Sequence, residues 1–85
     1  MKTLSITMQI NGKTVGIFPD PSFKEKSDLV AMARAIAKET WYNIDLIACV
    51  QLSDDPLDIE WRTCQFDKNG EVRKLWLEKQ EGDEE

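Results

Sequence analysis

Alternating apolar and polar positions open the chain. The apolar members of this alternation are Leu4, Ile6, Met8 and Ile10. A period of two predicts a strand with one buried face. Asn11-Gly12 follows, and it favours a two-residue hairpin turn because both residues tolerate positive φ. The second strand would then place its apolar residues on the same face, in the pairs Ile10–Lys13, Met8–Val15 and Ile6–Ile17.

The next segment combines a capping sequence with apolar residues at helical spacing. Ser22-x-x-Glu25 is a capping box, and Pro21 suits the first turn of a helix. Apolar residues then recur every three or four positions, which is typical of a helix with one buried face. They are Phe23, Leu29, Val30, Ala33, Ile36, Ala37 and Trp41. We expect the helix to end at Asn43.

Residues 44–53 predict a third strand whose even positions are all apolar and face the helix. These are Ile44, Leu46, Ala48, Val50 and Leu52. The sequence DDPLD supplies a turn into a fourth strand. Closing that turn between Asp54 and Ile59 would place Leu52 opposite Trp61 and Cys49 opposite Cys64.

The segment DKNG, residues 67–70, is a second turn with two alternatives. A two-residue loop at its last two positions would pair Trp61 with Glu78. A type I turn from Asp67 with a glycine bulge would pair Trp61 with Leu77. Only the second buries Leu75 and Leu77, and each buried leucine contributes about 1.5–3 kcal/mol. We therefore predict the bulged turn.

The predicted fold class is α+β with two layers. A five-stranded antiparallel sheet in the element order ββαβββ and the strand order 2-1-3-4-5 would carry one helix on one face, since a right-handed crossover lays the third strand beside the first. A β-grasp-like arrangement is the alternative, because that fold also begins with a hairpin and a helix. We expect one domain over residues 1–79 and a disordered acidic tail over residues 80–85.

The predicted register assigns Trp61 to the core and leaves an apolar patch on the face away from the helix. Its members would be Ile47, Phe66, Val72 and Trp76, with Arg62 stacked on Trp76 and Cys64 beside them. Exposed apolar patches of this kind usually mark contact sites.

Charge is distributed unevenly along the chain. The net charge is −5, with +2 over residues 1–42 and −7 over residues 43–85. An acidic surface repels phosphate backbones, so we expect no direct nucleic-acid binding, and it attracts basic proteins. The N-terminus lacks the apolar run of a signal peptide and no segment is long enough to span a membrane, so we expect a cytoplasmic protein without membrane contact.

The titratable residues form no recognisable catalytic or metal motif. Histidine is absent, which removes the commonest general base and metal ligand, so we expect no enzyme, no cofactor and no metal. Cys49 and Cys64 have no zinc-site spacing and are expected to be reduced, buried thiols. The acidic loop lacks calcium-loop spacing and is explained by turn chemistry. Its members are Asp54, Asp55 and Asp58, with Glu60 beside it.

The expected function is that of a small acidic protein-binding module. In size, charge and layout the chain is similar to small acidic proteins of phages and mobile elements, anti-CRISPR proteins among them. This similarity implies an inhibitor that mimics DNA and binds a basic nucleic-acid-handling protein. A homodimeric assembly protein is the alternative. The predicted partner-binding residues are Ile47, Asp54, Asp55, Asp58, Glu60, Arg62, Phe66, Val72 and Trp76.

Overall fold

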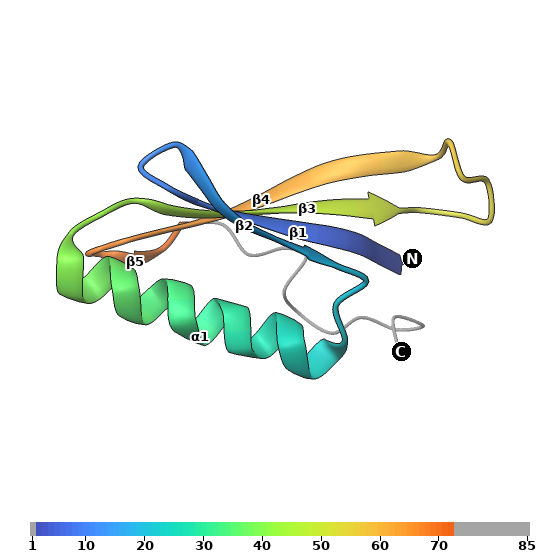
Figure 1. The fold of residues 1–85 in the computed structure, drawn as a ribbon. Helices are drawn as coiled ribbons and strands as arrows, with labels where there is room; N and C mark the ends of the chain where they lie inside the picture. Colours follow the sequence, from blue (N-terminus) through green and yellow to red (C-terminus); the bar gives the residue numbers. More distant parts are fainter. Residues whose placement is uncertain (1, 73–85) are drawn as a thin grey trace.

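The computed structural model describes residues 2–72 and shows an α+β fold with one antiparallel sheet and one helix (Figure 1). The elements are β1 (Lys2–Ile10), β2 (Lys13–Pro19), α1 (Phe23–Thr40), β3 (Ile44–Gln51), β4 (Ile59–Asp67) and β5 (Gly70–Glu71). The order β2-β1-β3-β4 is the one predicted, with β1 beside β3. The two residues of β5 pair with the end of β4. The rest of the predicted fifth strand and the acidic tail 80–85 lie outside the described residues.

The helix begins as the sequence predicts and ends earlier. The Ser22 hydroxyl accepts the Glu25 N–H at 3.1 Å, and the Glu25 carboxylate accepts the Ser22 N–H at 2.8 Å, which completes the capping box. At the other end, Trp41 adopts a left-handed conformation with φ 65° and donates its N–H to the Ala37 carbonyl. The helix therefore stops at Thr40, before Asn43.

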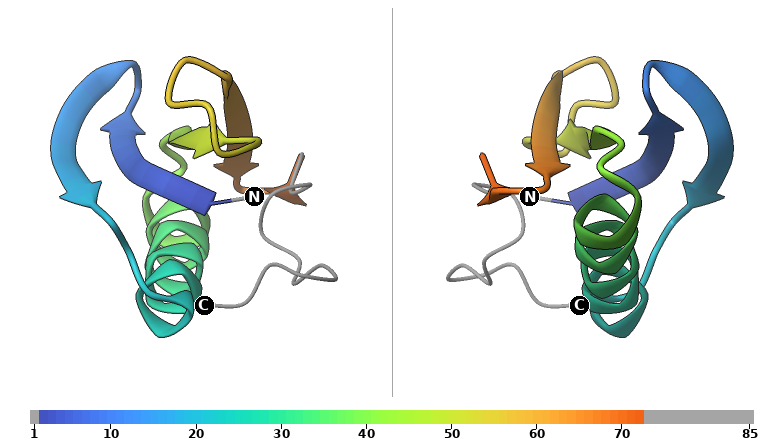
Figure 2. Two further views of the ribbon diagram at one scale, coloured as in Figure 1. Left: turned by 90° about the vertical axis from the view of Figure 1, so that its right-hand side faces the viewer. Right: turned by 90° about the vertical axis from the view of Figure 1, so that its left-hand side faces the viewer.

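The core lies between α1 and one face of the sheet. Leu29, Ala33 and Ala37 are buried on the helix, and the small alanines let it approach the strands closely. The even positions of β3 are buried, as predicted, together with residues of β1: Ile6, Met8, Ile44, Leu46, Ala48 and Val50. Leu52 was wrongly predicted to continue this buried face, because β3 ends at Gln51 and Leu52 is exposed. Figure 2 shows α1 on this face alone. Among the described residues no element covers the other face.

The β1–β2 hairpin contains a bulge that the sequence analysis missed. Met8 pairs with Gly16 and Gln9 pairs with Thr14, so Val15 is the extra residue and does not form the predicted pair with Met8. The bulge reverses the faces of the residues that follow. Ile17 lies opposite Thr7 on the outer face and is 64% exposed, which corrects the predicted core pair with Ile6. Phe18 takes its place opposite Ile6, on the helix side.

The β3–β4 register also differs from the prediction, and the difference reverses β4. Cys49 lies opposite Trp61, and Leu46 lies opposite Cys64. The last hydrogen bond of the ladder runs from the Leu52 N–H to the Asp58 carbonyl and is 2.8 Å long. The loop therefore closes between Leu52 and Asp58, not between Asp54 and Ile59 as predicted. The shift is an odd number of residues, so each β4 side chain changes face.

This shift overturns the predicted orientation of three β4 residues. Phe66 and Cys64 belong to the core and are fully buried, whereas Trp61 lies on the outer face and is 62% exposed. Phe66 sits opposite Ile44, and the Arg34 guanidinium lies 5.8 Å from the centre of its ring. The two cysteines, predicted to be opposite one another, are both buried but lie on opposite faces of the sheet.

The DKNG turn follows neither predicted register. Asp67 pairs with Gly70 and Phe66 pairs with Glu71, which places the two-residue loop at positions 68–69. The Asp67 carboxylate accepts the Asn69 N–H at 2.9 Å, and Gly70 has φ 112°, a conformation that favours glycine. The predicted pairs with Leu75 and Leu77 lie outside the described residues.

Candidate functional site

The hairpin formed by β3 and β4 extends beyond the first turn of α1 (Figure 1). We call the connecting loop and the adjoining start of β4, residues 52–62, the acidic arm. Its loop is held by short-range hydrogen bonds. The Ser53 hydroxyl accepts the Asp55 N–H at 3.2 Å, and the Asp55 carboxylate accepts the Leu57 N–H at 2.9 Å. A bond of 3.0 Å from the Asp58 N–H to the Asp55 carbonyl closes the turn. The arm therefore has a defined shape.

Large apolar side chains are exposed along the arm. Leu57 is 86% exposed at its tip, and Ile59 and Trp61 are exposed on the outer face of β4. The pair Cys49–Trp61 is followed along the sheet by the pair Ile47–Thr63. This pairing makes Ile47 a diagonal neighbour of Trp61 on the outer face. The Ile47 side chain is half-buried there. Together these residues form an apolar surface that begins at the loop and continues onto the sheet.

Negative charge surrounds this apolar surface. Four carboxylates of the arm are exposed: Asp54, Asp55, Asp58 and Glu60. Arg62 is the one basic residue of the segment 52–62, so the arm carries a net charge of −3. The Arg62 guanidinium lies 3.0 Å from the Glu60 carboxylate and neutralises it locally. Asp54 and Asp58 lie in the loop, where their charge faces solvent.

The structure brings together some of the predicted partner-binding residues and separates others. The four acidic residues lie on the arm, and Ile47 lies on the outer face beside it. Phe66 was wrongly assigned to this surface and belongs to the core. Val72 is exposed but lies near Asp45, Thr63 and Gln65, toward the other end of β4. Trp76 lies outside the described residues.

Arg62 also differs from its predicted position. It pairs with Ala48, whose side chain is buried on the helix face, so Arg62 lies on that face and not on the outer one. Its predicted stacking on Trp76 involves a residue outside the described part of the chain. The ion pair with Glu60 therefore lies on the side of the arm opposite to Trp61.

Sequence analysis missed Leu57, Ile59 and Trp61 as surface residues. Trp61 was assigned to the core because closing the loop between Asp54 and Ile59 places it opposite Leu52, and Ile59 follows the same alternation. One signal was available in the sequence. The even positions of β4 include Cys64 and Phe66, so the face that they form is about as apolar as the face that contains Ile59 and Trp61 and could equally be the buried one.

The described residues form neither a metal-binding cluster nor a membrane-spanning helix. Within residues 2–72, no three potential metal ligands of the Asp, Glu, Cys or His type come together. The helix in that range does not combine the length and the apolar composition that crossing a membrane requires. Comparison of the chain with protein-family models, with curated proteins and with solved structures gave no match.

Proposed function

We propose that the chain is a small acidic protein-binding module that binds a basic protein through the acidic arm. The observation that carries the proposal is the exposure of Leu57 and Trp61 on a projecting hairpin that is otherwise acidic. Tryptophan is enriched among the residues that dominate binding energy at protein interfaces. A residue of this size gains most when a partner removes it from water.

The carboxylates of the arm indicate which kind of partner would bind it. A cluster with a net charge of −3 speeds the encounter with a positively charged surface and disfavours acidic partners. Nucleic-acid-binding proteins carry such surfaces, since they neutralise phosphates with lysine and arginine. We therefore infer that the partner is a nucleic-acid-handling protein and that the arm occupies its phosphate-binding surface as an inhibitor, in the manner of a DNA mimic. A cytoplasmic encounter is consistent with two buried cysteines that do not face each other.

The experiment is capture of the partner from host lysate, followed by calorimetry with the purified partner. Trp61→Ser removes the proposed anchor and is expected to weaken binding by about 2 kcal/mol or more, which is the range of interface hot spots. Asp54→Asn/Asp58→Asn is expected to slow association and to reduce its dependence on salt. Met32→Gln is the matched control, because Met32 is an exposed apolar residue on the helix.

Three results would contradict the proposal. They are equal weakening by Met32→Gln, binding that is independent of salt, or a partner that binds nucleic acid and this protein at the same time. A homodimeric assembly protein is the alternative function. It would appear in the same experiment as retention of untagged copies of the chain and in sedimentation as a dimer that Trp61→Ser dissociates.

A further inference from the structure

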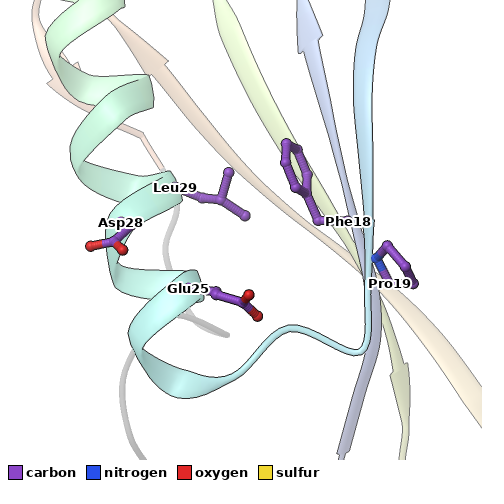
Figure 3. A pocket seen from close by; sticks show the side chains of 5 residues that line it. All are labelled: Phe18, Pro19, Glu25, Asp28 and Leu29. Carbon is purple, nitrogen blue, oxygen red and sulfur yellow. The ribbon is translucent and has the colours of Figure 1, made fainter.

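The edge strand β2 and the first turns of α1 enclose a pocket that is separate from the acidic arm. The helix packs mainly against β3, β4 and β5, so it diverges from β2, which lies at the sheet edge (Figure 2). A pocket of about 300 Å³ lies between them. Phe18, Pro19, Glu25, Asp28 and Leu29 line it, and in Figure 3 Glu25 and Leu29 extend from the helix toward Phe18.

No other strand within residues 2–72 pairs with the free edge of β2, so its backbone has unpaired groups next to this pocket. The Asp20 N–H donates to the Leu4 carbonyl at 2.8 Å, which fixes the phase of the β1–β2 ladder. Because antiparallel pairs alternate, Phe18 directs its N–H and C=O toward β1, whereas Ile17 directs both groups away from the sheet. The backbone of Pro19 also points toward the free edge, and proline is tolerated at this position because it has no N–H that would be left unpaired. The edge therefore offers one donor at Ile17 and acceptors at Ile17 and Pro19.

The chemistry of the pocket fits an aliphatic chain that ends in a positive charge. Leu29 is buried at its base, and Phe18 and Pro19 form an apolar wall. Glu25 uses Oε1 to accept the Ser22 N–H, and a carboxylate has a second oxygen that can accept from a ligand. Asp28 adds negative charge, part of which Lys24 offsets at 3.1 Å. Lysine and arginine place an apolar stem on such a wall and their charge at a carboxylate.

We propose that a short extended segment of a partner protein adds to the edge of β2 at residues 17–19 and inserts a lysine or arginine side chain into this pocket. Strand addition of this kind takes affinity from main-chain hydrogen bonds and specificity from pockets that receive alternate side chains. The peptide residue opposite Phe18 would face the helix side and enter the pocket. The residue opposite Ile17 would lie on the outer face, against an exposed isoleucine, and is therefore expected to be apolar.

The size of the pocket and the bulge in β2 set the length of the segment. A volume of about 300 Å³ is at the lower limit of small-molecule pockets, which suits one side chain. The bulge at Val15 interrupts the straight edge, so regular pairing extends only over residues 17–19. No residue of the acidic arm contributes to this site, which is independent of the proposed function.

The test is a titration of the ¹⁵N-labelled full chain with the capped peptide acetyl-Thr-Val-Lys-Val-Thr-amide, followed by NMR. We expect shifts centred on Ile17, Phe18 and Leu29, and we expect amide hydrogen exchange at Ile17 to slow by about tenfold near saturation because this N–H gains a partner. A peptide with glutamate in place of lysine is expected to bind more weakly, because it meets two carboxylates. Absence of shifts up to millimolar peptide, or binding that leaves the Ile17 amide unprotected, would overturn the proposal.

Two variants separate this site from the arm. Glu25→Gln keeps a side chain that can complete the capping box and is expected to weaken the lysine peptide by about two- to fivefold, while a norleucine peptide binds unchanged. Asp54→Asn removes a charge of the arm and is expected to change neither peptide. Equal weakening of both peptides by Glu25→Gln would show that the carboxylate does not contact the lysine, and the charge-recognition part of the proposal would then fail.

Discussion

At the scale of single residues, Asn11 shows how one side chain can continue a sheet. Its N–H donates to the Asn43 carbonyl at 2.8 Å, as in a regular antiparallel pair. Because Asn11 has a φ of 50° in the turn, its backbone carbonyl points away from this ladder. The side-chain Oδ1 replaces the carbonyl and accepts the Asn43 N–H at 3.0 Å. The turn residue that favours positive φ therefore also connects the hairpin to the helix–β3 junction.

Substitution of Asn11 tests this second role. Glycine fits the turn, but Asn11→Gly leaves the Asn43 N–H without its acceptor, so we expect the free energy of unfolding to fall by about 1 kcal/mol. Asn11→Asp keeps an acceptor at the same position and is the matched control. Urea denaturation measures both. If glycine proved as stable as the parent protein, the Asn11 side chain would have only a local role in the turn.

At the scale of elements, the sequence predicts periodicity better than register. The hairpin turn, the capping box and the buried face of β3 follow from local signals, and each appears in the structure. The order of the first four strands follows from the handedness of the crossover. These features depend on residues close together in the chain or on a single rule of topology.

The register of β4 could not be predicted in the same way. Its odd positions include Ile59 and Trp61, and its even positions include Cys64 and Phe66, so neither face is clearly polar. The choice depends on where the loop closes, and the loop is shaped by hydrogen bonds that the Ser53 hydroxyl and the Asp55 carboxylate accept. Any odd shift in loop closure reverses the strand, so the difference of three residues in register moved Phe66 and Trp61 to the wrong faces.

A pair of aromatic truncations in β4 tests the observed register. Phe66→Ala empties a fully buried position and is expected to lower the free energy of unfolding by about 3–5 kcal/mol. Trp61→Ala removes a larger side chain from an exposed position and is expected to cost less than about 1 kcal/mol. Thermal and urea unfolding followed by circular dichroism compare the two. The reverse order of stabilities would restore the register in which Trp61 is buried.

At the scale of the whole molecule, β2 forms one edge of the sheet. On the β2 edge, a bulge at Val15 interrupts the regular ladder, and such bulges are a common device against edge-to-edge association. Removal of Val15 would leave every other pair of the hairpin in its present register, because this residue has no partner in β1. The bulge therefore affects the edge more than the core.

Deletion of Val15 is accordingly expected to keep the fold and change the state of association. We expect the free energy of unfolding to change by no more than about 1 kcal/mol, and the straightened edge to self-associate more strongly than the parent at equal concentration. Val15→Thr, which keeps the bulge and removes an exposed apolar group, is the control. Sedimentation velocity measures the difference. Equal association of the parent and the deletion variant would show that the bulge does not protect this edge.

The bond between Asn11 and Asn43 also has a kinetic consequence. It joins residues 32 positions apart, and the segment between them contains all of β2 and α1. Loop closure of this length is entropically unfavourable until the flanking strands have paired. We therefore expect this bond to form after the folding transition state. Its loss would then speed unfolding and leave the folding rate nearly unchanged, so that Asn11 extends the lifetime of the folded protein without helping it to fold.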